Sequence, residues 1–314
     1  GLKRMSSPTT ARLGIVWAGG GMLLATAATF FTPGMANIEL IIIAIVIGGG
    51  LAWMTAKKVA MTDMPQMIAL YNGMGGGAAA AIAAVEMFKV HDLEICVEIL
   101  AIIGGIIGAI SFSGSIIAFG KLQGIIKGSF RFKGQNLLNL LIMLSLILIS
   151  ITILMDFELM KNPVVAVFII ALVFGIAMTL PIGGADMPVV ISLYNALTGL
   201  AVGFEGYVLQ NYAMIIAGTV VGAAGTLLTQ LMAKAMNRSL GNVLFSGFGD
   251  QSISVEGDSE NQGEMKPIES SDASIMMAFA QKVIIIPGYG MAVAQAQQKV
   301  WEFSQLLIES GVDV

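Results

Sequence analysis

Residues 93–119 read LEICVEILAIIGGIIGAISFSGSIIAF, an apolar run broken only by glycine, serine and two acidic residues near its start. A helix needs about 20 residues to cross the hydrocarbon core of a bilayer, and this run exceeds that length. The whole chain has the same character, because 56% of its residues are hydrophobic and 11% are charged. A soluble domain carries about 25% charged residues. The run is therefore predicted to be one membrane-spanning helix among several.

Seven further stretches are long and apolar enough to cross a membrane, which predicts an α-helical polytopic domain with about eight spans. The eight spans are 12–31, 37–55, 64–88, 93–119, 135–155, 163–180, 187–207 and 210–233. Glycine and methionine are abundant, with 38 and 21 residues, as expected where helices pack closely in lipid. We assign residues 1–240 to this transmembrane domain.

The basic residues between the spans indicate which side of the membrane each connection faces, since Lys and Arg are retained on the cytoplasmic side. With a cytoplasmic N-terminus, only Lys89 and Lys161 lie outside. The basic residues that then lie inside are Lys3, Arg4, Arg12, Lys57, Lys58, Lys121, Lys127, Arg131, Lys133, Lys234 and Arg238. Both ends of the chain are therefore predicted to be cytoplasmic.

An internal repeat relates two of the spans. Asp63-Met-Pro is followed by Leu70-Tyr-Asn, and the same residues return at the same spacing as Asp186-Met-Pro and Leu193-Tyr-Asn. Membrane transport proteins are often built from such repeats, with their sites between the related halves. The pattern predicts two parallel four-helix halves whose corresponding helices run in the same direction.

The chain changes character after residue 240. Residues 241–274 are polar and acidic without periodicity, which predicts a flexible linker. The remainder, 275–314, alternates between helix and strand patterns. The expected elements are a helix at 275–281, a strand at 282–286, a glycine turn, a helix at 291–310 and the opening of a second strand at 312–314.

Residues 282–297, KVIIIPGYGMAVAQAQ, carry the most specific local motif. A β-branched run leads into Gly288, Tyr289, Gly290, Met291, Ala292 and Val293, the G-x-G-x-x-G pattern with Val in its third slot. Such a turn directs backbone N–H groups and a helix N-terminus at a pyrophosphate. The stretch therefore predicts the start of a Rossmann-like, nucleotide-binding α/β domain.

Polar residues of the repeat are candidates for a path through the membrane. Asp186 begins a span after a glycine-rich loop, where it can cap the helix or exchange protons at the membrane mouth, whereas Asp63 reads more simply as a cap. Asn72 and Asn195 lie nine residues after these aspartates. At about 1.5 Å per residue they are about 13 Å deep in a core about 30 Å thick. They can link helices by hydrogen bonds, or form with Tyr71 a polar step for protons or ions.

Two charged residues complete the candidate set. Glu98 is ionisable within a span, so it either faces a cavity or extends to the outer interface. Arg238 follows the last span, where it anchors the helix on the basic side or couples the linker to the membrane mouth. Cys96 and His91 are the single cysteine and histidine, which leaves no disulfide within the chain and no Cys- or His-cluster metal site. We expect no metal.

An ion channel or secondary transporter with a nucleotide-sensing cytoplasmic domain is the alternative class. Pro287–Gly290 resembles a potassium filter, but such a filter requires a loop between membrane helices, and this turn follows a predicted soluble strand. No charged substrate site is evident either. A purely structural scaffold is disfavoured by the polar residues of the repeat.

Five stretches, in order and over essentially the whole chain, resemble the β subunit of the proton-translocating NAD(P) transhydrogenase. These stretches are Ala60–Pro65, Phe112–Lys121, Gly183–Val190, Lys234–Ser239 and Pro287–Gln297. The resemblance implies that the membrane domain couples hydride transfer between NAD(H) and NADP(H) to inward proton movement. It places Asp186, Asn195 and Arg238 at positions used for coupling or proton passage.

The resemblance also implies the cofactors and partners. NADP(H) is expected at Gly288, Gly290 and Val293, and NAD(H) on a partner, the transhydrogenase α subunit. A bacterial inner-membrane location, contact with lipid, a dimer of α–β units and no nucleic-acid partner are expected as well.

Three departures from the family pattern bear on these expectations. Members usually have one more span before Leu2 and a much longer NADP(H) domain, so we expect this chain to lack material at both ends. Many members also carry an intramembrane histidine in the proton path. Here that role would fall to Tyr71, Asn72, Asn195, Glu98 or bound water.

Overall fold

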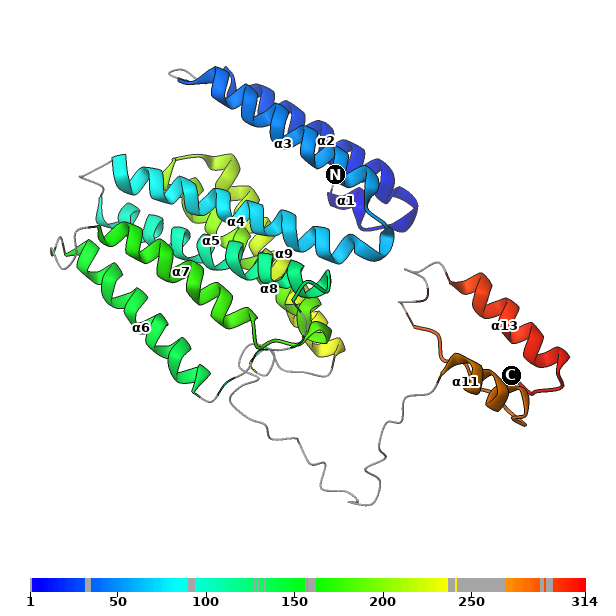
Figure 1. Cartoon of the computed structure of the whole chain (residues 1–314). Coiled ribbons are helices and arrows are strands. Elements are labelled where there is room, and N and C mark those ends of the chain that lie inside the picture. The colour runs from blue at the N-terminus through cyan, green and yellow to red at the C-terminus, as the bar shows by residue number, and fades with distance from the viewer. Residues whose placement is uncertain are drawn as a thin grey trace. The chain divides into compact units, whose positions relative to one another are not determined.

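A computed structural model describes residues 2–31, 35–89, 94–126, 128, 130, 132, 134–155, 157, 162–236, 241, 269–288, 291 and 296–314. Within them, nearly all regular structure is helical (Figure 1). Seven of the described helices are long and apolar enough to cross a membrane: α2 (Pro8–Thr29), α3 (Ile38–Lys58), α4 (Met64–Lys89), α5 (Ile95–Leu122), α6 (Gln135–Leu154), α8 (Met187–Val208) and α9 (Tyr212–Ala235).

The eighth predicted span, 163–180, is also an apolar helix, α7 (Pro163–Thr179). It has 17 residues and is shorter than the other seven. The prediction of eight spans is therefore confirmed for seven, and the eighth is a helix at the lower limit of a spanning length. Its first residue is a proline. Proline suits this position because a backbone N–H in the first turn would have no partner within the helix.

Residues 1–59 form a compact unit by themselves, made of α1 (Leu2–Met5), α2 and α3. Hardly any side chain of α2 and none of α3 is buried within the chain. Apolar surfaces of this size are unfavourable in water but suit hydrocarbon or a neighbouring membrane helix. The exposure of these two helices is thus consistent with their assignment as spans.

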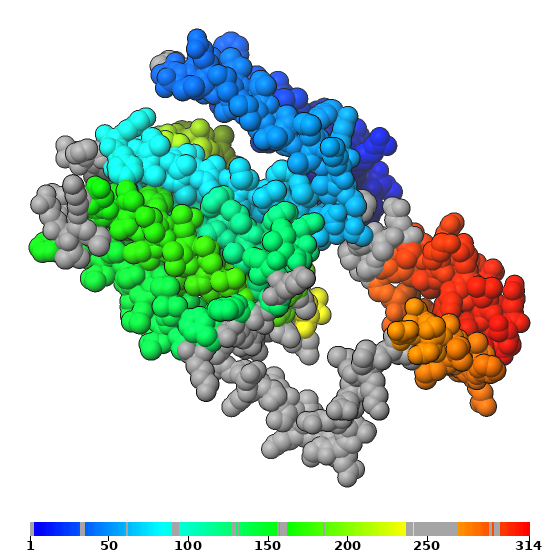
Figure 2. Space-filling model, in the orientation of Figure 1, coloured from blue at the N-terminus to red at the C-terminus, as the bar shows by residue number. Residues whose placement is uncertain are grey.

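The second unit, residues 60–314, contains the remaining membrane helices. Its central helix is α5, which packs against α4, α7 and α8, while α9 packs on α8 and α6 on α7. The space-filling view shows α6 and α7 lying against each other (Figure 2). Because α5 contacts three helices, its buried face decides which groups meet in the interior.

Glycine permits the closest helix contacts in this unit. A Cβ atom at Gly76 of α4 would lie 2.9 Å from the carbonyl oxygen of Gly108 on α5. A Cβ atom at Gly199 of α8 would lie 2.5 Å from the amide nitrogen of Gly222 on α9. Small residues at such crossings let helix backbones approach in a membrane, where packing takes the place of the hydrophobic effect. They hold together two hairpins, α4–α5 and α8–α9.

The sequence repeat has a structural counterpart. A 3₁₀ turn precedes each repeat helix, η1 (Met61–Asp63) before α4 and η2 (Gly184–Asp186) before α8. Along both helices, rising residue numbers meet falling numbers on α5, so both are antiparallel to α5. Hence α4 and α8 run in the same direction, as predicted. The division into two four-helix halves stays a prediction: α4 and α8 share α5 as a partner, and the compact division of the chain falls after residue 59.

The described residues after 268 contain two helices, α11 (Ser270–Ala278) and α13 (Gln297–Glu309). The predicted strand 282–286 is absent from this described part, where Lys282 and Asp313 form only an isolated parallel bridge. Ile284 and Ile286 are 75% and 88% exposed, so no neighbouring strand covers them there. A Rossmann-like unit is therefore not seen in the described residues. The predicted strand fails to form there because a β-branched run is stable as a strand only when neighbouring strands pair with it.

Candidate functional site

A buried serine on α5 makes hydrogen bonds to the repeat helix α8. The Ser111 Oγ donates to the carbonyl oxygen of Tyr194 at 3.0 Å and lies 2.6 Å from the Thr198 Oγ1. A serine hydroxyl has one proton to donate, so Ser111 accepts from Thr198 while it donates to the carbonyl. All three residues are buried. We call these three hydrogen-bonded residues, Ser111, Tyr194 and Thr198, the middle level of the site.

The second level lies one turn along α5. There the Asn72 Nδ2 of α4 donates to the Ser115 Oγ at 3.1 Å, and Ser115 is fully buried. Residues 111 and 115 are four apart and therefore share one face of α5. Two levels of hydrogen-bonding groups thus follow the same face, at a separation of about 6 Å along the helix.

The repeat brings the two asparagines to a common depth. Gly75 and Thr198 occupy equivalent repeat positions, and a Cβ atom at Gly75 would lie 3.3 Å from the Thr198 Cγ2. Since α4 and α8 run in the same direction and meet at this point, Asn72 and Asn195, each three residues earlier, lie at one level. Both are half-buried. That Asn195 faces Asn72 stays a prediction.

The tyrosines of the repeat have different surroundings. Tyr194 is 1% exposed; its hydroxyl lies 2.6 Å from the Thr179 Oγ1 of α7, and its ring fills the space left by Gly114. Tyr71 is 44% exposed on α4. The sequence analysis selected Tyr71, but Tyr194 is the tyrosine that lies inside the bundle.

Asp186 lies in the turn that precedes the repeat helix α8. This residue is 8% exposed and ends η2, immediately before α8. The preceding turn is fixed by Lys121 at the end of α5, whose buried Nζ donates to the carbonyl oxygens of Leu180 and, at 2.6 Å, Ile182. A buried ammonium group needs such acceptors, because burying an unpaired charge is costly. Lys121 therefore helps to set the position of the Asp186 turn.

The sequence analysis missed Glu205. This residue of α8 is fully buried, and both carboxyl oxygens have no hydrogen-bond partner among the described residues. The sequence does contain a signal for this residue: Glu205 is the sole acidic residue of the predicted spans 187–207 and 210–233, and an ionisable residue within a span indicates a functional site. Glu98, which was selected, lies half-buried in the first turn of α5.

Several predicted site residues cannot be placed. Arg238, Tyr289, Gly290, Ala292 and Val293 lie outside the described residues. Gly288 and Met291 are described: the Met291 N–H donates to the Gly288 carbonyl at 3.1 Å, and nothing lies within 4 Å of a Cβ built at Gly288. Within the part of the chain that the structure describes, no three His, Cys, Asp or Glu side chains form a metal-binding group.

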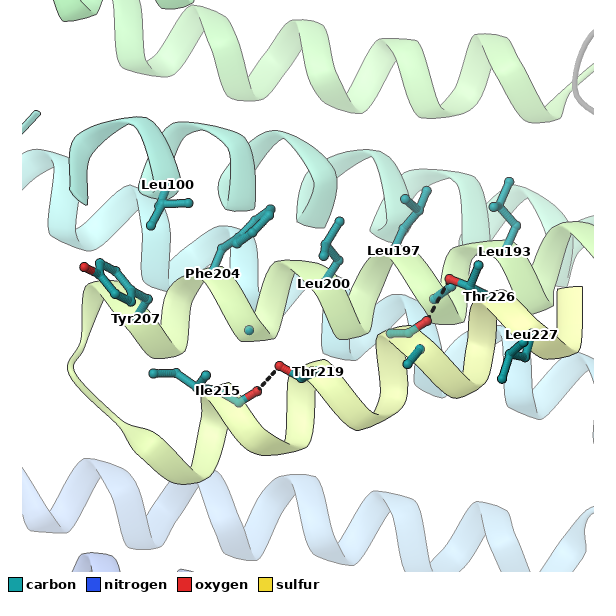
Figure 3. A pocket seen from close by; sticks show the side chains of 15 residues that line it. Leu100, Leu193, Leu197, Leu200, Phe204, Tyr207, Ile215, Thr219, Thr226 and Leu227 are labelled. Carbon is teal, nitrogen blue, oxygen red and sulfur yellow. Dashed lines mark hydrogen bonds between the residues drawn. The ribbon is translucent and has the colours of Figure 1, made fainter. Parts of the chain in front are cut away.

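An apolar pocket of about 730 Å³ lies along α8 and α9 (Figure 3), and neither Ser111, Ser115 nor Thr198 lines it. Leu193, Leu197 and Leu200 of α8 line it. Thr219 and Thr226 also line it, but their hydroxyls donate to carbonyl oxygens of their own helix, at 2.8 Å each. The two threonine hydroxyls are therefore already satisfied within α9.

A bundle of membrane helices with hydrogen-bonded polar groups at its centre defines the class, an integral membrane protein with a polar interior. The chain belongs to the NAD(P) transhydrogenase beta subunit family, whose model matches residues 1–314. Two proteins of Rhodospirillum rubrum, each named NAD(P) transhydrogenase subunit beta, are 38% identical to it over 327 residues. These alignments cover 100% of this chain and 69% of each relative.

The family membership confirms the resemblance drawn from the five stretches. The chain is a membrane subunit of a proton-translocating transhydrogenase, and a β subunit implies an α subunit as its partner. The alternative of a channel or transporter is not supported. The family also implies nicotinamide dinucleotides as substrates.

Proposed function

We propose that the polar groups between α4, α5 and α8 carry protons across the membrane while hydride passes between NAD(H) and NADP(H). We call Asn72, Ser111, Ser115, Asn195 and Thr198 the polar column. The supporting observation is the pair of hydrogen bonds that Ser111 makes to α8, one turn from the bond between Ser115 and Asn72. Hydroxyls both donate and accept, so with water between the levels they relay a proton without becoming charged.

Asp186 is the cytoplasmic end of this path in our proposal. Its place in a turn held by Lys121 allows a change of charge at the carboxyl to shift the loop as a unit. Arg238, Tyr71 and Glu98 have supporting roles: Arg238 links the last span to the linker, and Tyr71 and Glu98 border the path on α4 and α5. Coupling of this kind is reciprocal, so nucleotide binding must also change proton affinity at the mouth.

We further propose three regions: a proton-translocating domain at 1–240, a linker at 241–274 and the start of an NADP(H)-binding domain at 275–314. The cofactor would be held at Gly288, Tyr289, Gly290, Met291, Ala292 and Val293. Open space around Gly288 and the short turn from Gly288 to Met291 fit a backbone that approaches a phosphate. When bound, NADP(H) supplies the hydride chemistry, and the chain's own residues supply positioning and a change between two states.

The partner α subunit binds NAD(H) in this proposal, and two α–β units form a dimer. We infer from the distribution of basic residues that both ends of the chain are cytoplasmic, and we propose a bacterial inner membrane as the location of the spans. The exposed faces of α2 and α3 are available for lipid or for helices of the partner. Proton movement supplies enough free energy to bias hydride transfer, because one charge moved through about 100 mV gives about 2.3 kcal/mol.

The test removes the middle level of the column. The double variant Ser111→Ala and Thr198→Val, in the complete enzyme with its α subunit in vesicles, should slow hydride-coupled proton uptake about tenfold, equivalent to about 1.4 kcal/mol in the barrier. Proton uptake is followed with a pH-sensitive dye while NADPH formation is followed by absorbance.

The matched control is Thr219→Val with Thr226→Val on α9. These hydroxyls are also on a membrane helix, but they are exposed beside the apolar pocket and bond to carbonyl oxygens of their own helix (Figure 3). This control should pump like the wild type. Equal losses in both double variants, or unchanged pumping without Ser111 and Thr198 hydroxyls, would refute the proposed path.

A further inference from the structure

We propose that Glu205 is the proton-binding group at the end of the polar column opposite Asp186, where protons enter from or leave to the outer side. This inference rests on the proposed function and extends it to a residue outside the repeat motifs. It starts from two facts: Glu205 is fully buried, and neither of its carboxyl oxygens has a hydrogen-bond partner in the described part of the chain.

Glu205 lies on the same side of α8 as the middle level of the column. It follows Thr198 by seven residues, which is two helical turns, so the two side chains project in nearly the same direction. Its partner on α5 is Gly104, seven residues before Ser111. The column therefore continues from Ser111 and Thr198 toward Gly104 and Glu205, over about 10 Å.

The protein leaves space for this carboxyl. A Cβ atom at Gly104 would collide with the Glu205 Oε1 and would lie 3.3 Å from its Cδ. Glycine at 104 thus admits the side chain between α5 and α8. A carboxyl that only needed to reach water would extend toward the helix end, three residues away at Val208, instead of filling this space.

The charged neighbours favour exchange of a proton over a fixed ion pair. Glu86 of α4 is the group that acts electrostatically on Glu205, and its charge has the same sign. On α5, Glu98 lies further toward the outer end, and on α9 the near titratable group is Tyr212, which is exposed. A buried carboxylate facing another acid is unfavourable, whereas the protonated form needs no counter-charge.

Position along α8 separates the two ends of the path. Asp186 precedes the first residue of α8, and Glu205 lies 19 residues further, about 28 Å along the helix axis. This is close to the thickness of the hydrocarbon core, about 30 Å. One carboxyl at each end of a single helix, with Asn195 and Thr198 between them, gives a path that loads at one face and releases at the other.

The experiment uses the complete enzyme with its α subunit in vesicles and the variant Glu205→Gln, which keeps the size and removes the exchangeable proton. Hydride-coupled proton uptake should fall about 100-fold, as for loss of a proton-transferring side chain. A transhydrogenation cycle that needs no proton movement should stay close to the wild-type rate. The carbonyl band of a protonated carboxylic acid should also disappear from the infrared difference spectrum.

Two further variants make the result specific. Glu205→Asp retains a proton-binding group and should recover a measurable part of the pumping that Glu205→Gln loses. The control Glu39→Gln removes an exposed carboxylate of α3 and should pump like the wild type. Recovery by aspartate distinguishes proton binding from packing, even where glutamine disturbs assembly.

Pumping by Glu205→Gln at the wild-type rate would overturn the inference, and so would an aspartate variant no better than glutamine. Failure of the proposed function is recognised separately. In that case the wild-type enzyme would show no hydride-coupled proton uptake, or the Ser111 and Thr198 double variant would pump protons like the wild type.

Discussion

The two repeat helices begin with the same residues and have different surroundings. In α8, Tyr194 is enclosed between α5 and α7 and Asp186 is buried at the helix start. In α4, Tyr71 is largely exposed and Asp63 is half-buried. The difference follows from neighbours: α8 packs closely against both α5 and α9, whereas α5 is the single close neighbour of α4 and its contact with α8 is smaller.

Equal sequence patterns therefore do not imply equal roles. The asparagines lie at one depth in both helices, so the repeat conserves a polar level at the centre of the bundle. Of the aspartates and tyrosines of the repeat, only those of the α8 copy, Asp186 and Tyr194, are buried, and a change of protonation there would act on a packed interior. Under the proposed function, we therefore expect coupling to take place at the α8 copy and the α4 copy to complete the path.

The largest expected difference concerns the tyrosines. Tyr194→Ala removes a buried ring beside Gly114 and should lower the free energy of unfolding by about 3–5 kcal/mol, as for other buried aromatic residues. Tyr71→Ala should cost less than about 1 kcal/mol, because its side chain is exposed. Unfolding of the purified chain in detergent micelles measures both. Equal losses would contradict the different burial of the two tyrosines in the folded chain.

A second pair tests what the copies have in common. Gly76 and Gly199 occupy equivalent repeat positions, and each contacts a glycine of the following helix. Valine at either site should separate the helices of its hairpin and destabilise the chain by about 1–3 kcal/mol. Valine at Gly48 of α3, where a Cβ meets open space, is the control and should have little effect. Tolerance of valine at only one of the two sites would disprove the equivalence of the hairpins.

A smaller effect is expected for the asparagines. Asn72→Leu leaves Ser115 without its donor and Asn195→Leu removes the polar group at the same level. Each should slow proton-coupled transhydrogenation about tenfold, or about 1.4 kcal/mol. NADPH binding should remain near the wild-type affinity, which titration of the complete enzyme measures. A variant that loses NADPH binding and proton coupling together would instead place the asparagine in a structural role.

Much of the membrane fold follows from the sequence alone. Length and apolar composition locate the spans, and the repeat predicts that α4 and α8 run in the same direction. The difference between Tyr71 and Tyr194 could not be read from the repeat, since burial depends on which helices lie beside each copy. Packing across α5 joins residues 83 or 87 positions apart, and no local pattern indicates such contacts.

Two errors have clear physical causes. Glu205 is not part of the repeat pattern, because position 82, its counterpart, is an isoleucine. The strand at 282–286 was inferred from β-branched residues, but strand formation requires a pairing partner, and the described residues supply one bridge. Motif and composition identified the family, whereas the geometry of the site required the structure.

The most direct test of the central claim compares the aspartates that begin the two repeat helices. Asp186→Asn and Asp63→Asn are made in the complete enzyme with its α subunit, and the pH dependence of NADPH release is measured for each. Asp186→Asn should abolish that dependence and uncouple proton uptake from hydride transfer, while Asp63→Asn should retain both. Wild-type pH dependence and full proton pumping in Asp186→Asn would show that Asp186 is merely a helix cap and that coupling occurs elsewhere.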